Sequence, residues 1–336
     1  MSLSPRMKYS LLPLLALALA FAPLSVSAKT ADGKQKLVLV AGKPSHGPRE
    51  HEYNAGMLLL AKCLAQGAPD LKVEVVNNGW PQDDSVFNDA DAVVFFMDGG
   101  AKHEAARPDH LAKIDELSKR GVGIGALHYG VEVVADQTGE RFRHWIGGHY
   151  ENMYSVNPMW EPNFTNFPIH PITRGVKPFQ IKDEWYFNMR FLEGFTADGA
   201  TEKDGTKFVP ILVARPDDQV RNGPYSAPKG PYPHIQAATG RPEAMMWCVE
   251  RPDGGRGFGF TGAHYHDNWG NDSFRKVVLN ALVWVAKGEV PANGVESTIT
   301  KDDLDANLDP KPPKKPAAPP ATPPAAGPAP APTKAN

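Results

Sequence analysis

Cysteine is nearly absent from this sequence. The 336 residues include only two, Cys63 and Cys248, and the two form no C-x-x-C pair. This excludes a disulfide-rich scaffold, a thiolate zinc site and a dithiol redox centre. Cys63 lies in a helical pattern and Cys248 in an apolar run, so each is most simply a small buried hydrophobe. A single disulfide between them is the open alternative.

The sequence also lacks an excess of charge of one sign. It has 36 Lys and Arg against 38 Asp and Glu, a formal net charge of −2. A binding surface for nucleic acid or an anionic membrane needs a concentration of basic residues. The one basic cluster lies near the C-terminus, among prolines at residues 311–315. We therefore expect no nucleic-acid partner.

A long apolar run occurs only near the N-terminus. A basic start at residues 7–10 precedes apolar residues 11–24, and the run ends in a small-x-small sequence at Ala28. This order is typical of a secretory signal peptide over residues 1–28. The run is too short for a comfortable transmembrane helix. We expect a secreted or periplasmic protein without a membrane span after cleavage; an uncleaved anchor is the alternative.

Proline and alanine dominate the other end of the chain. Residues 291–336, most strongly from Asp309, form a Pro/Ala/Lys-rich segment that cannot offset its ordering entropy by burial. We predict a disordered tail there and a short linker over residues 29–35. The folded part is then residues 36–290, a size that fits one domain.

Apolar runs and helical patterns alternate through the first half of this domain. Runs that predict buried strands lie at 36–41, 92–97 and 122–127, with an alternating strand at 71–76 and helices at 52–66 and 109–120. Further strands are expected at 208–214, 244–249 and 257–261, and a closing helix at 272–287. The order predicts an α/β fold: a doubly wound, mostly parallel sheet with helices on both faces. Residues 140–200 form a long irregular insertion over the carboxyl edge.

Three histidines follow apolar runs of this sheet. His128 stands at a strand-to-helix turn, the usual place of a nucleophile, and His264 and His266 follow a late strand. Residues i and i+2 of an extended segment point to one side. Three neutral imidazoles suit a divalent metal, zinc most of all. The alternative is that the rings hydrogen-bond one another and line a sugar pocket.

Acid–base candidates lie near the same edge. His46 is predicted as a fourth ligand or an acid/base group, with helix capping as its alternative, whereas His51 is interpreted as structural. Glu132, four residues after His128 on an expected helix, would orient that imidazole, or it is a solvated carboxylate. Glu184 is a candidate general base or ligand, and its alternative is a structural role within the insertion.

Other residues near these loops are candidates for binding a substrate. Asp98 opens a glycine turn whose backbone N–H groups could face an oxyanion, or the turn is a plain one. Tyr129, Trp185 and Tyr186 offer aromatic faces of the kind that suit sugar rings, although aromatic residues more often belong to the core.

Residues 36–290 resemble the ThuA-like family, which is related to the class I glutamine amidotransferase fold. The resemblance rests on GKPSHG at residues 42–47, GALH at 125–128, HPIT at 170–173, DEWY at 183–186 and GFGFTGAHYH at 257–266, before the helix ending NALVW at 280–284. Amidotransferases carry a Cys where His128 stands and a His-x-Glu pair where His264 and His266 stand. Glutamine hydrolysis needs the thiolate, so the resemblance implies that this activity is absent.

The family's association with trehalose utilisation implies a small-molecule carbohydrate partner. We therefore expect an exported enzyme acting on a carbohydrate or keto-sugar by metal-assisted hydrolysis, isomerisation or lyase chemistry. A non-catalytic sugar-binding or scaffolding module is the alternative. Nothing in the sequence predicts the oligomeric state.

Overall fold

The computed structural model describes residues 33–312. The predicted signal peptide lies outside the described residues, as do residues 313–336. The first half has the expected alternation: β1 (Gln35–Ala41), α1 (Tyr53–Gly67), β2 (Leu71–Val76), β3 (Ala92–Phe96), α2 (Pro108–Lys119) and β4 (Gly123–Leu127). The second half completes the sheet with β11 (Thr201–Lys203), β12 (Thr206–Ala214), β13 (Glu243–Glu250) and β14 (Arg256–Phe260), and closes with α6 (Asp272–Val285).

One eight-stranded sheet organises these elements in the order β11-β12-β13-β14-β4-β3-β1-β2. The strands from β14 to β2 are parallel, whereas β13, β12 and β11 extend the sheet as antiparallel neighbours. Strands β1 and β3 are apolar at almost every position because both of their faces are covered. This confirms the predicted α/β fold with a mostly parallel sheet.

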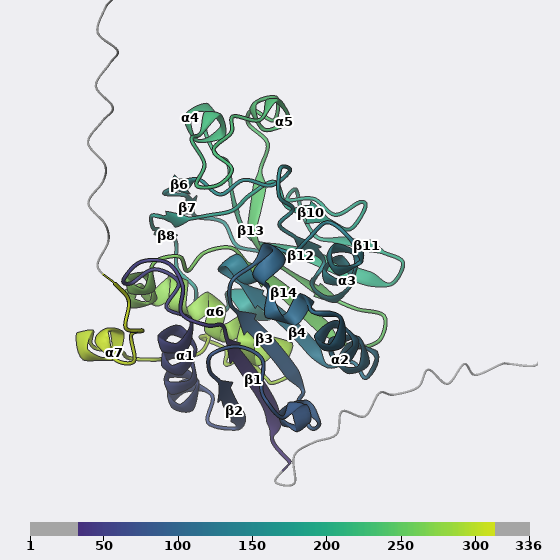
Figure 1. The fold of residues 1–336 in the computed structure, drawn as a ribbon, viewed down its shortest axis with the longest axis vertical. Coiled ribbons are helices and arrows are strands. Elements are labelled where there is room, and N and C mark those ends of the chain that lie inside the picture. The colour runs from purple at the N-terminus through teal and green to yellow at the C-terminus, as the bar shows by residue number, and fades with distance from the viewer. Residues whose placement is uncertain (1–32, 313–336) are drawn as a thin grey trace, which may run out of the picture.

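Helices cover both faces of the sheet, as predicted (Figure 1). Leu37, Leu39 and Ala41 of β1 face a core that includes α1 and α6, whereas Val38 and Val40 face a second core that includes α2. The second core also contains α3 (Gln137–Ile146), a helix that the sequence analysis did not separate from the irregular insertion. The large apolar residues of α3, Phe142, Trp145 and Ile146, lie in the second half of the helix. The apolar pattern that would predict a helix is therefore short.

The remaining insertion is built from short strand pairs. Antiparallel pairs join β5 (Gly148–His149) with β10 (Arg190–Phe191), β6 (Met159–Trp160) with β9 (Asp183–Glu184), and β7 (Asn163–Phe164) with β8 (Phe179–Gln180). Two short helices, α4 (Asp218–Asn222) and α5 (Pro233–Gln236), lie beyond these pairs at the top of Figure 1. Strand β9 matters most, because it brings Glu184 to the carboxyl edge of the sheet.

Residues 291–312 pack on the domain, which corrects the prediction of a disordered tail from residue 291. Val295 is fully buried, and its N–H donates to Asn280 Oδ1 of α6 at 2.7 Å. Helix α7 (Lys301–Asp305) begins with a capping box in which Thr300 and Asp303 satisfy each other's backbone groups. Composition averaged over the whole segment hid these ordered residues.

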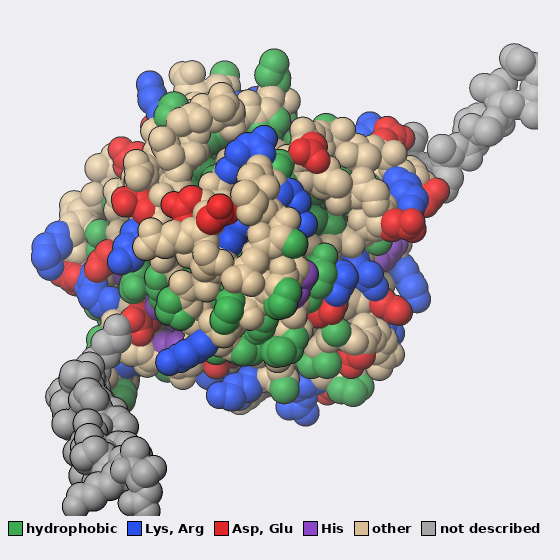
Figure 2. Space-filling model, turned by 90° about the horizontal axis from the view of Figure 1, so that it is seen from above, with side chains coloured by type: hydrophobic (Ala, Val, Ile, Leu, Met, Phe, Trp, Pro, Cys, Tyr) green, Lys and Arg blue, Asp and Glu red, His purple; other side chains and the backbone are tan. Residues whose placement is uncertain are grey.

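Among the described residues, no helix is long and apolar enough to cross a membrane. Acidic and basic side chains are interspersed on the face drawn in Figure 2. Both cysteines are buried and free, which confirms their interpretation as small core residues.

Candidate functional site

Side chains from three strand ends and the insertion meet at the carboxyl edge of the sheet. His51 follows β1, His128 follows β4 and His264 follows β14, while Glu184 comes from β9. Strands β14 and β4 are neighbours in the sheet, and only β3 separates β4 from β1. Ligand sites of open α/β sheets form at this edge, where the loops leave the strands.

The four side chains converge on one small space. His51 Nε2 lies 2.9 Å from His264 Nδ1 and 3.1 Å from His128 Nε2. Glu184 Oε2 lies 3.2 Å from His264 Nδ1 and 3.4 Å from His128 Nε2. All four residues are buried, and one ligand atom from each lies within 4.8 Å of the others. His128, His264 and Glu184 were predicted to lie at this edge of the sheet, and the structure brings them together.

Outer contacts fix the protonation of two rings. Tyr53 Oη donates to the Asp98 carboxylate at 2.7 Å, so this oxygen accepts from His51 Nδ1–H at 2.6 Å. His128 Nδ1–H donates to the carbonyl oxygen of Thr261 at 2.8 Å. In a neutral imidazole only one nitrogen carries hydrogen. When both rings are neutral, the two Nε2 atoms that face each other are therefore both lone-pair acceptors.

Facing lone pairs at this distance repel unless a cation or a proton lies between them. Tetrahedral zinc binds imidazole nitrogen at about 2.0–2.1 Å, which places neighbouring ligand atoms about 3.4 Å apart. The separations between the four ligand atoms given above approach that edge length. The donor set of three imidazoles and one carboxylate could therefore hold a divalent metal ion.

Burial and the carboxylate set the electrostatics of the cluster. Burial lowers the pKa of His51 well below its usual value, and the neighbouring imidazoles act in the same direction. Burial also opposes ionisation of Glu184, but the adjacent imidazoles of His128 and His264 outweigh it and hold its pKa below the usual range. For His264 the Glu184 carboxylate likewise outweighs burial and raises the pKa.

Asp183 explains why the insertion and the loop after β14 meet. Its carboxylate is wholly buried and accepts from the backbone N–H of Ala263 at 2.7 Å and of His264 at 3.0 Å. It also accepts from Asn268 Nδ2 at 2.9 Å. Strand β9 is thereby tied to the loop that carries His264, and Glu184 next in the chain is held against the imidazoles.

A cavity of about 640 Å³ opens onto the cluster, a size suited to a small molecule. Its lining includes the following residues: His46, Glu50, His51, Tyr129, Glu132, Asn152, Asn157, Glu184, Tyr186 and His264. Burial, with a contribution from Glu184, raises the pKa of Glu132 to about 7. Burial also raises the pKa of Tyr129 to about 12. Glu132 can therefore hold or release a proton near neutral pH.

His46 lies at the mouth of the cluster. Its ring stacks on His51 with centroids 3.6 Å apart, and its Nδ1 lies 2.8 Å from Ser45 Oγ. Burial lowers its pKa, although the side chain keeps 39% of its exposure. His46 Nδ1 is also 3.8 Å from Asp98 Oδ1. The ring thus lines the cavity and borders the cluster without facing its centre.

His266 does not join the cluster, which corrects its predicted placement. The chain bends at His264, and a 3₁₀ helix begins at His266 itself. His264 and His266 are therefore not an extended i, i+2 pair. Burial lowers the pKa of His266 to about 4, and the charged groups acting on it are Glu52, Arg49 and Asp267.

His51 takes the place expected for His266. His51, which was interpreted as structural, does not cap α1, because the N-cap is Glu52; it lies instead at the centre of the cluster. The available signal was its position in the loop after β1, at the same sheet edge as His128. A histidine there needs no motif of its own to reach the other strand ends.

Glu132 reaches the site by a different route from the one predicted. His128 begins a short 3₁₀ turn, His128–Val131, with φ of +49°, and Glu132 beyond it is extended. The expected helix face therefore does not exist, and the carbonyl of Thr261, not Glu132, orients the His128 ring. His103 is buried, and its Nε2 lies 3.0 Å from the Gly130 carbonyl oxygen, where it supports this turn.

Two predicted substrate contacts lie elsewhere. Trp185 is fully buried in the core against Phe164, Phe260 and Phe274 and does not line the cavity. Asp98 does not line the cavity either; it contacts the cluster indirectly, by accepting a hydrogen bond from Tyr53. Tyr186 lines the cavity, with its hydroxyl 3.3 Å from both His128 Nε2 and Glu184 Oε2. Tyr129 lines it as well.

The glycine turn after Asp98 does not offer the predicted pair of N–H donors to an oxyanion, because one of the two is already bonded. A Cβ on Gly99 would lie 2.3 Å from the Tyr129 carbonyl, and the N–H of Gly100 already donates to the Glu132 carbonyl at 3.0 Å. The turn instead joins the end of β3 to the His128 turn.

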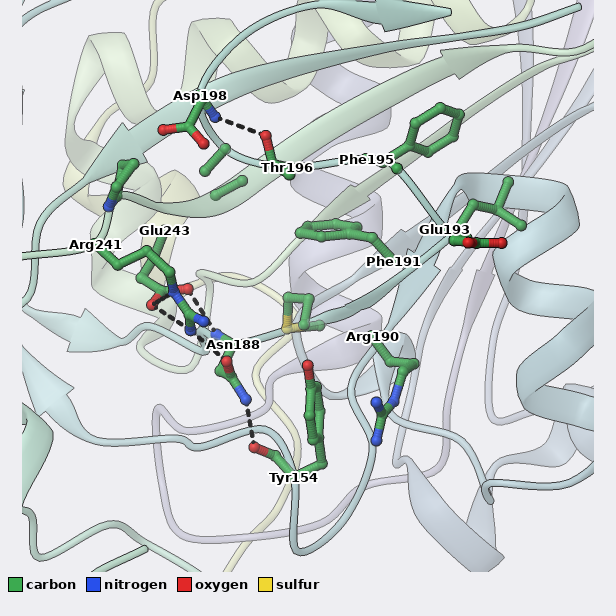
Figure 3. Close-up of a pocket in the computed structure, with 16 residues that line it drawn as sticks. Tyr154, Asn188, Arg190, Phe191, Glu193, Phe195, Thr196, Asp198, Arg241 and Glu243 are labelled. Atoms are coloured by element: carbon green, nitrogen blue, oxygen red, sulfur yellow. Dashed lines mark hydrogen bonds and ion pairs between the residues drawn. The ribbon is translucent and has the colours of Figure 1, made fainter. Parts of the chain in front are cut away.

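A second cavity, of about 330 Å³ and shown in Figure 3, shares no lining residue with the cavity at the cluster. Arg241 contacts Glu243 and Asn188 there, and Asn188 donates to the Tyr154 carbonyl at 2.7 Å. Arg190 pairs with Glu151 beside it at 2.9 Å. Its charged groups already neutralise one another, so the histidine cluster is the stronger candidate for chemistry.

Comparison with known proteins agrees with this fold. A family model described as trehalose utilisation (ThuA) matches residues 37–285, and the chain belongs to this family. A ThuA-like protein from Bacteroides uniformis is similar over 75% of this chain and 91% of its own, with 11% identity and a TM-score of 0.50. Another ThuA-like protein, from Parabacteroides merdae, is similar over 80% of this chain and 94% of its own, with 15% identity and a TM-score of 0.49. No curated protein matches the sequence.

Proposed function

We propose that this protein is an exported, metal-dependent enzyme acting on a neutral carbohydrate or keto-sugar. The observation that carries the metal is the pair of facing Nε2 atoms of His51 and His128, with His264 Nδ1 and the Glu184 carboxylate beside them. Zinc is the ion that this donor set suits best. When bound, such an ion would supply Lewis acidity toward a carbonyl oxygen that enters as a fifth ligand beside the four protein donors.

The cavity supports a neutral polyhydroxylated substrate. Among the described residues that line it, Glu50, Glu132 and Glu184 are carboxylates, and none is lysine or arginine. A phosphorylated or carboxylated sugar would meet repulsion there without a basic partner. Asn152 and Asn157 offer amide donors and acceptors for hydroxyl groups. The family's description, trehalose utilisation, points to the same class of molecule.

The chain's own groups supply the proton transfers in this proposal. Glu132, with its pKa near 7, gives or takes a proton at the cavity wall, and His46 is the second titratable group within reach. Tyr129 and Tyr186 orient the substrate beside them. This set serves hydrolysis, isomerisation or elimination of a sugar. Export is proposed from the signal-peptide pattern of residues 1–28.

The test is turnover of neutral sugars and keto-sugars, and of their phosphate esters, by zinc-loaded and chelator-treated protein. We expect turnover of a neutral compound that is lost on chelation and in His128→Ala, but kept in Tyr154→Phe, a change in the second cavity. Sugar affinity by calorimetry that is indifferent to chelators, without turnover, would instead support the non-catalytic binding module.

A further inference from the structure

The chain's last described residues pass directly behind the histidine cluster. We call residues 291–312 the C-terminal strap. It leaves α6, forms α7 and ends beside the loop of residues 46–52, which carries His46 and His51. Arg49 of this loop pairs with Asp305 at 2.8 Å, and Asn54 Nδ2 donates to Asp309 Oδ1 at 3.0 Å.

Lys311 is the innermost contact of the strap. Its ammonium group forms an ion pair with Glu52 Oε1 at 3.2 Å, and the side chains keep only 3% and 1% of their exposure. The same ammonium donates to the backbone carbonyls of Glu50 and of His51, the latter at 3.2 Å. Asp309 N–H donates to the other oxygen of Glu52 at 2.9 Å. A lysine is rarely buried in this way without a specific partner.

The loop that Lys311 contacts needs to be held in place. His46, Arg49 and His51 all have φ between +48° and +63°, a region that non-glycine residues seldom occupy. Such conformations persist when the surrounding contacts over-determine them. Two hydrogen bonds from one ammonium to consecutive carbonyls fix the peptide on each side of the His51 Cα. The direction of the His51 imidazole depends on those peptides.

We propose that Lys311 is a positioning residue of the site, and that the strap sets the geometry of His51 toward His128 and His264. Its effect on metal affinity rests on the ligand set proposed above, whereas its effect on the His51 ring does not. A partner that orients a ligand from outside typically changes metal affinity by about 10- to 100-fold when it is removed.

The first variant is Lys311→Met, which keeps the aliphatic stem and removes the ammonium. Two quantities are measured: zinc affinity by chelator competition, and the rate at which diethyl pyrocarbonate modifies His51 in metal-free protein, with exposed His234 as the internal reference. We expect zinc affinity to fall at least about 10-fold and His51 modification to rise by a similar factor. Lys301→Met is the matched control: this strap lysine is 84% exposed, and both quantities should stay within about twofold of wild type.

A second variant separates positioning from stability. Lys311→Met alone leaves the Glu52 charge buried and unpaired, which destabilises a protein strongly. In the double variant Glu52→Gln/Lys311→Met no charge is stranded, so the thermal midpoint should recover while the loss of zinc affinity and the faster His51 modification remain.

Two outcomes decide against the proposal. A folded variant with both quantities within about twofold of wild type overturns it, as does failure of both variants to fold, because the strap would then hold the whole domain. If wild-type protein binds no zinc, the metal in the proposed function fails, and the His51 modification rate alone decides the role of Lys311.

Discussion

At the scale of single residues, hydrogen bonds behind the cluster matter as much as the cluster itself. Tyr53 lies between His51 and Asp98 and leaves the His51 Nε2 lone pair facing the other imidazoles. Burial and the Asp98 carboxylate both raise the pKa of Tyr53, so its hydroxyl keeps its proton. The ring orientation of His51 therefore depends on a residue two positions along the chain.

Replacing Tyr53 with phenylalanine should weaken metal binding. His51 Nδ1–H then loses its acceptor and Asp98 loses a donor, so zinc affinity should fall by about 10- to 100-fold. Chelator competition measures this directly, with Tyr154→Phe as the control far from the cluster. Unchanged affinity in Tyr53→Phe would show that His51 needs no outer partner.

Glu132 predicts a pH dependence of stability in metal-free protein. The pKa of Glu132 is about 7 in the folded protein and 4.5 in the unfolded chain. Between pH 4.5 and pH 7 the folded state therefore binds more protons than the unfolded state. The free energy of unfolding then falls as pH rises from 4.5 to 7 and stays lowered above. Glutamine has no proton to lose, so the Glu132→Gln variant should not lose stability in this way. At pH 8 its free energy of unfolding should exceed that of wild type by up to about 3 kcal/mol, whereas at pH 4 it should not.

Urea unfolding at both pH values tests this prediction. Glu193→Gln, at a side chain with 94% exposure, is the matched control and should show no such pH-dependent difference. A stability difference between Glu132→Gln and wild type that is the same at pH 4 and pH 8 would contradict the raised pKa.

The residue patterns revealed part of the cluster. His128 and His264 could be found because each directly follows an apolar run, and the structure brings them together with Glu184. His51 lies ten residues after β1 in a loop without periodicity, so its direction depends on positive φ angles and on contacts from distant segments. Such features have no local sequence signal, and the same holds for the turn that removes His266.

At the scale of elements, close packing of helix α3 on strand β14 is set by glycine. A Cβ on Gly257 would lie 2.1 Å from the Trp145 carbonyl oxygen, which belongs to the backbone of α3 and cannot move alone. Trp145 and Ile146 are buried at this contact. The strand that leads to His264 is thereby fixed against the helix.

Gly257→Ala should therefore destabilise the fold by about 2–3 kcal/mol, because overpacking forces the helix away from the strand. Gly199→Ala is the matched control: nothing lies within 4 Å of its added Cβ, so its effect should stay within about 0.5 kcal/mol. Urea unfolding compares the two. Equal stabilities would mean that α3 does not constrain β14.

Elements with long, strong periodicity were predicted well. Strands β3 and β4 are apolar throughout and α6 is apolar on a broad face, so their patterns were unambiguous. Helix α3 was missed because its apolar residues lie in its last turns. The helix expected after His128 fails because a residue with positive φ begins the turn.

At the scale of the whole molecule, the doubly wound sheet followed from the order of elements, whereas the end of the domain did not. Val295, Ile299 and Leu304 reach the core or pack against it, yet they lie in a segment whose overall composition is dominated by later prolines. Averaging over residues 291–336 placed the domain boundary too early.

A chain ending after residue 290 should be less stable than one ending after residue 312. Val295 loses its burial, and Asn280 and buried Arg275 lose partners at Val295 and Ser297. We expect a decrease in unfolding free energy of at least about 3 kcal/mol from lost burial and unpaired groups. Equal stability of the two chains would mean that the strap adds nothing to the domain.

The most direct test of the metal proposal is X-ray absorption at the zinc edge, together with metal stoichiometry, on the purified protein. We predict about one zinc per chain, bound by three imidazole nitrogens and one carboxylate at about 2.0–2.1 Å. His51→Ala should lose the ion and His266→Ala should keep it. Protein that takes up no divalent metal, or that binds it equally well in His51→Ala, would contradict the site described here.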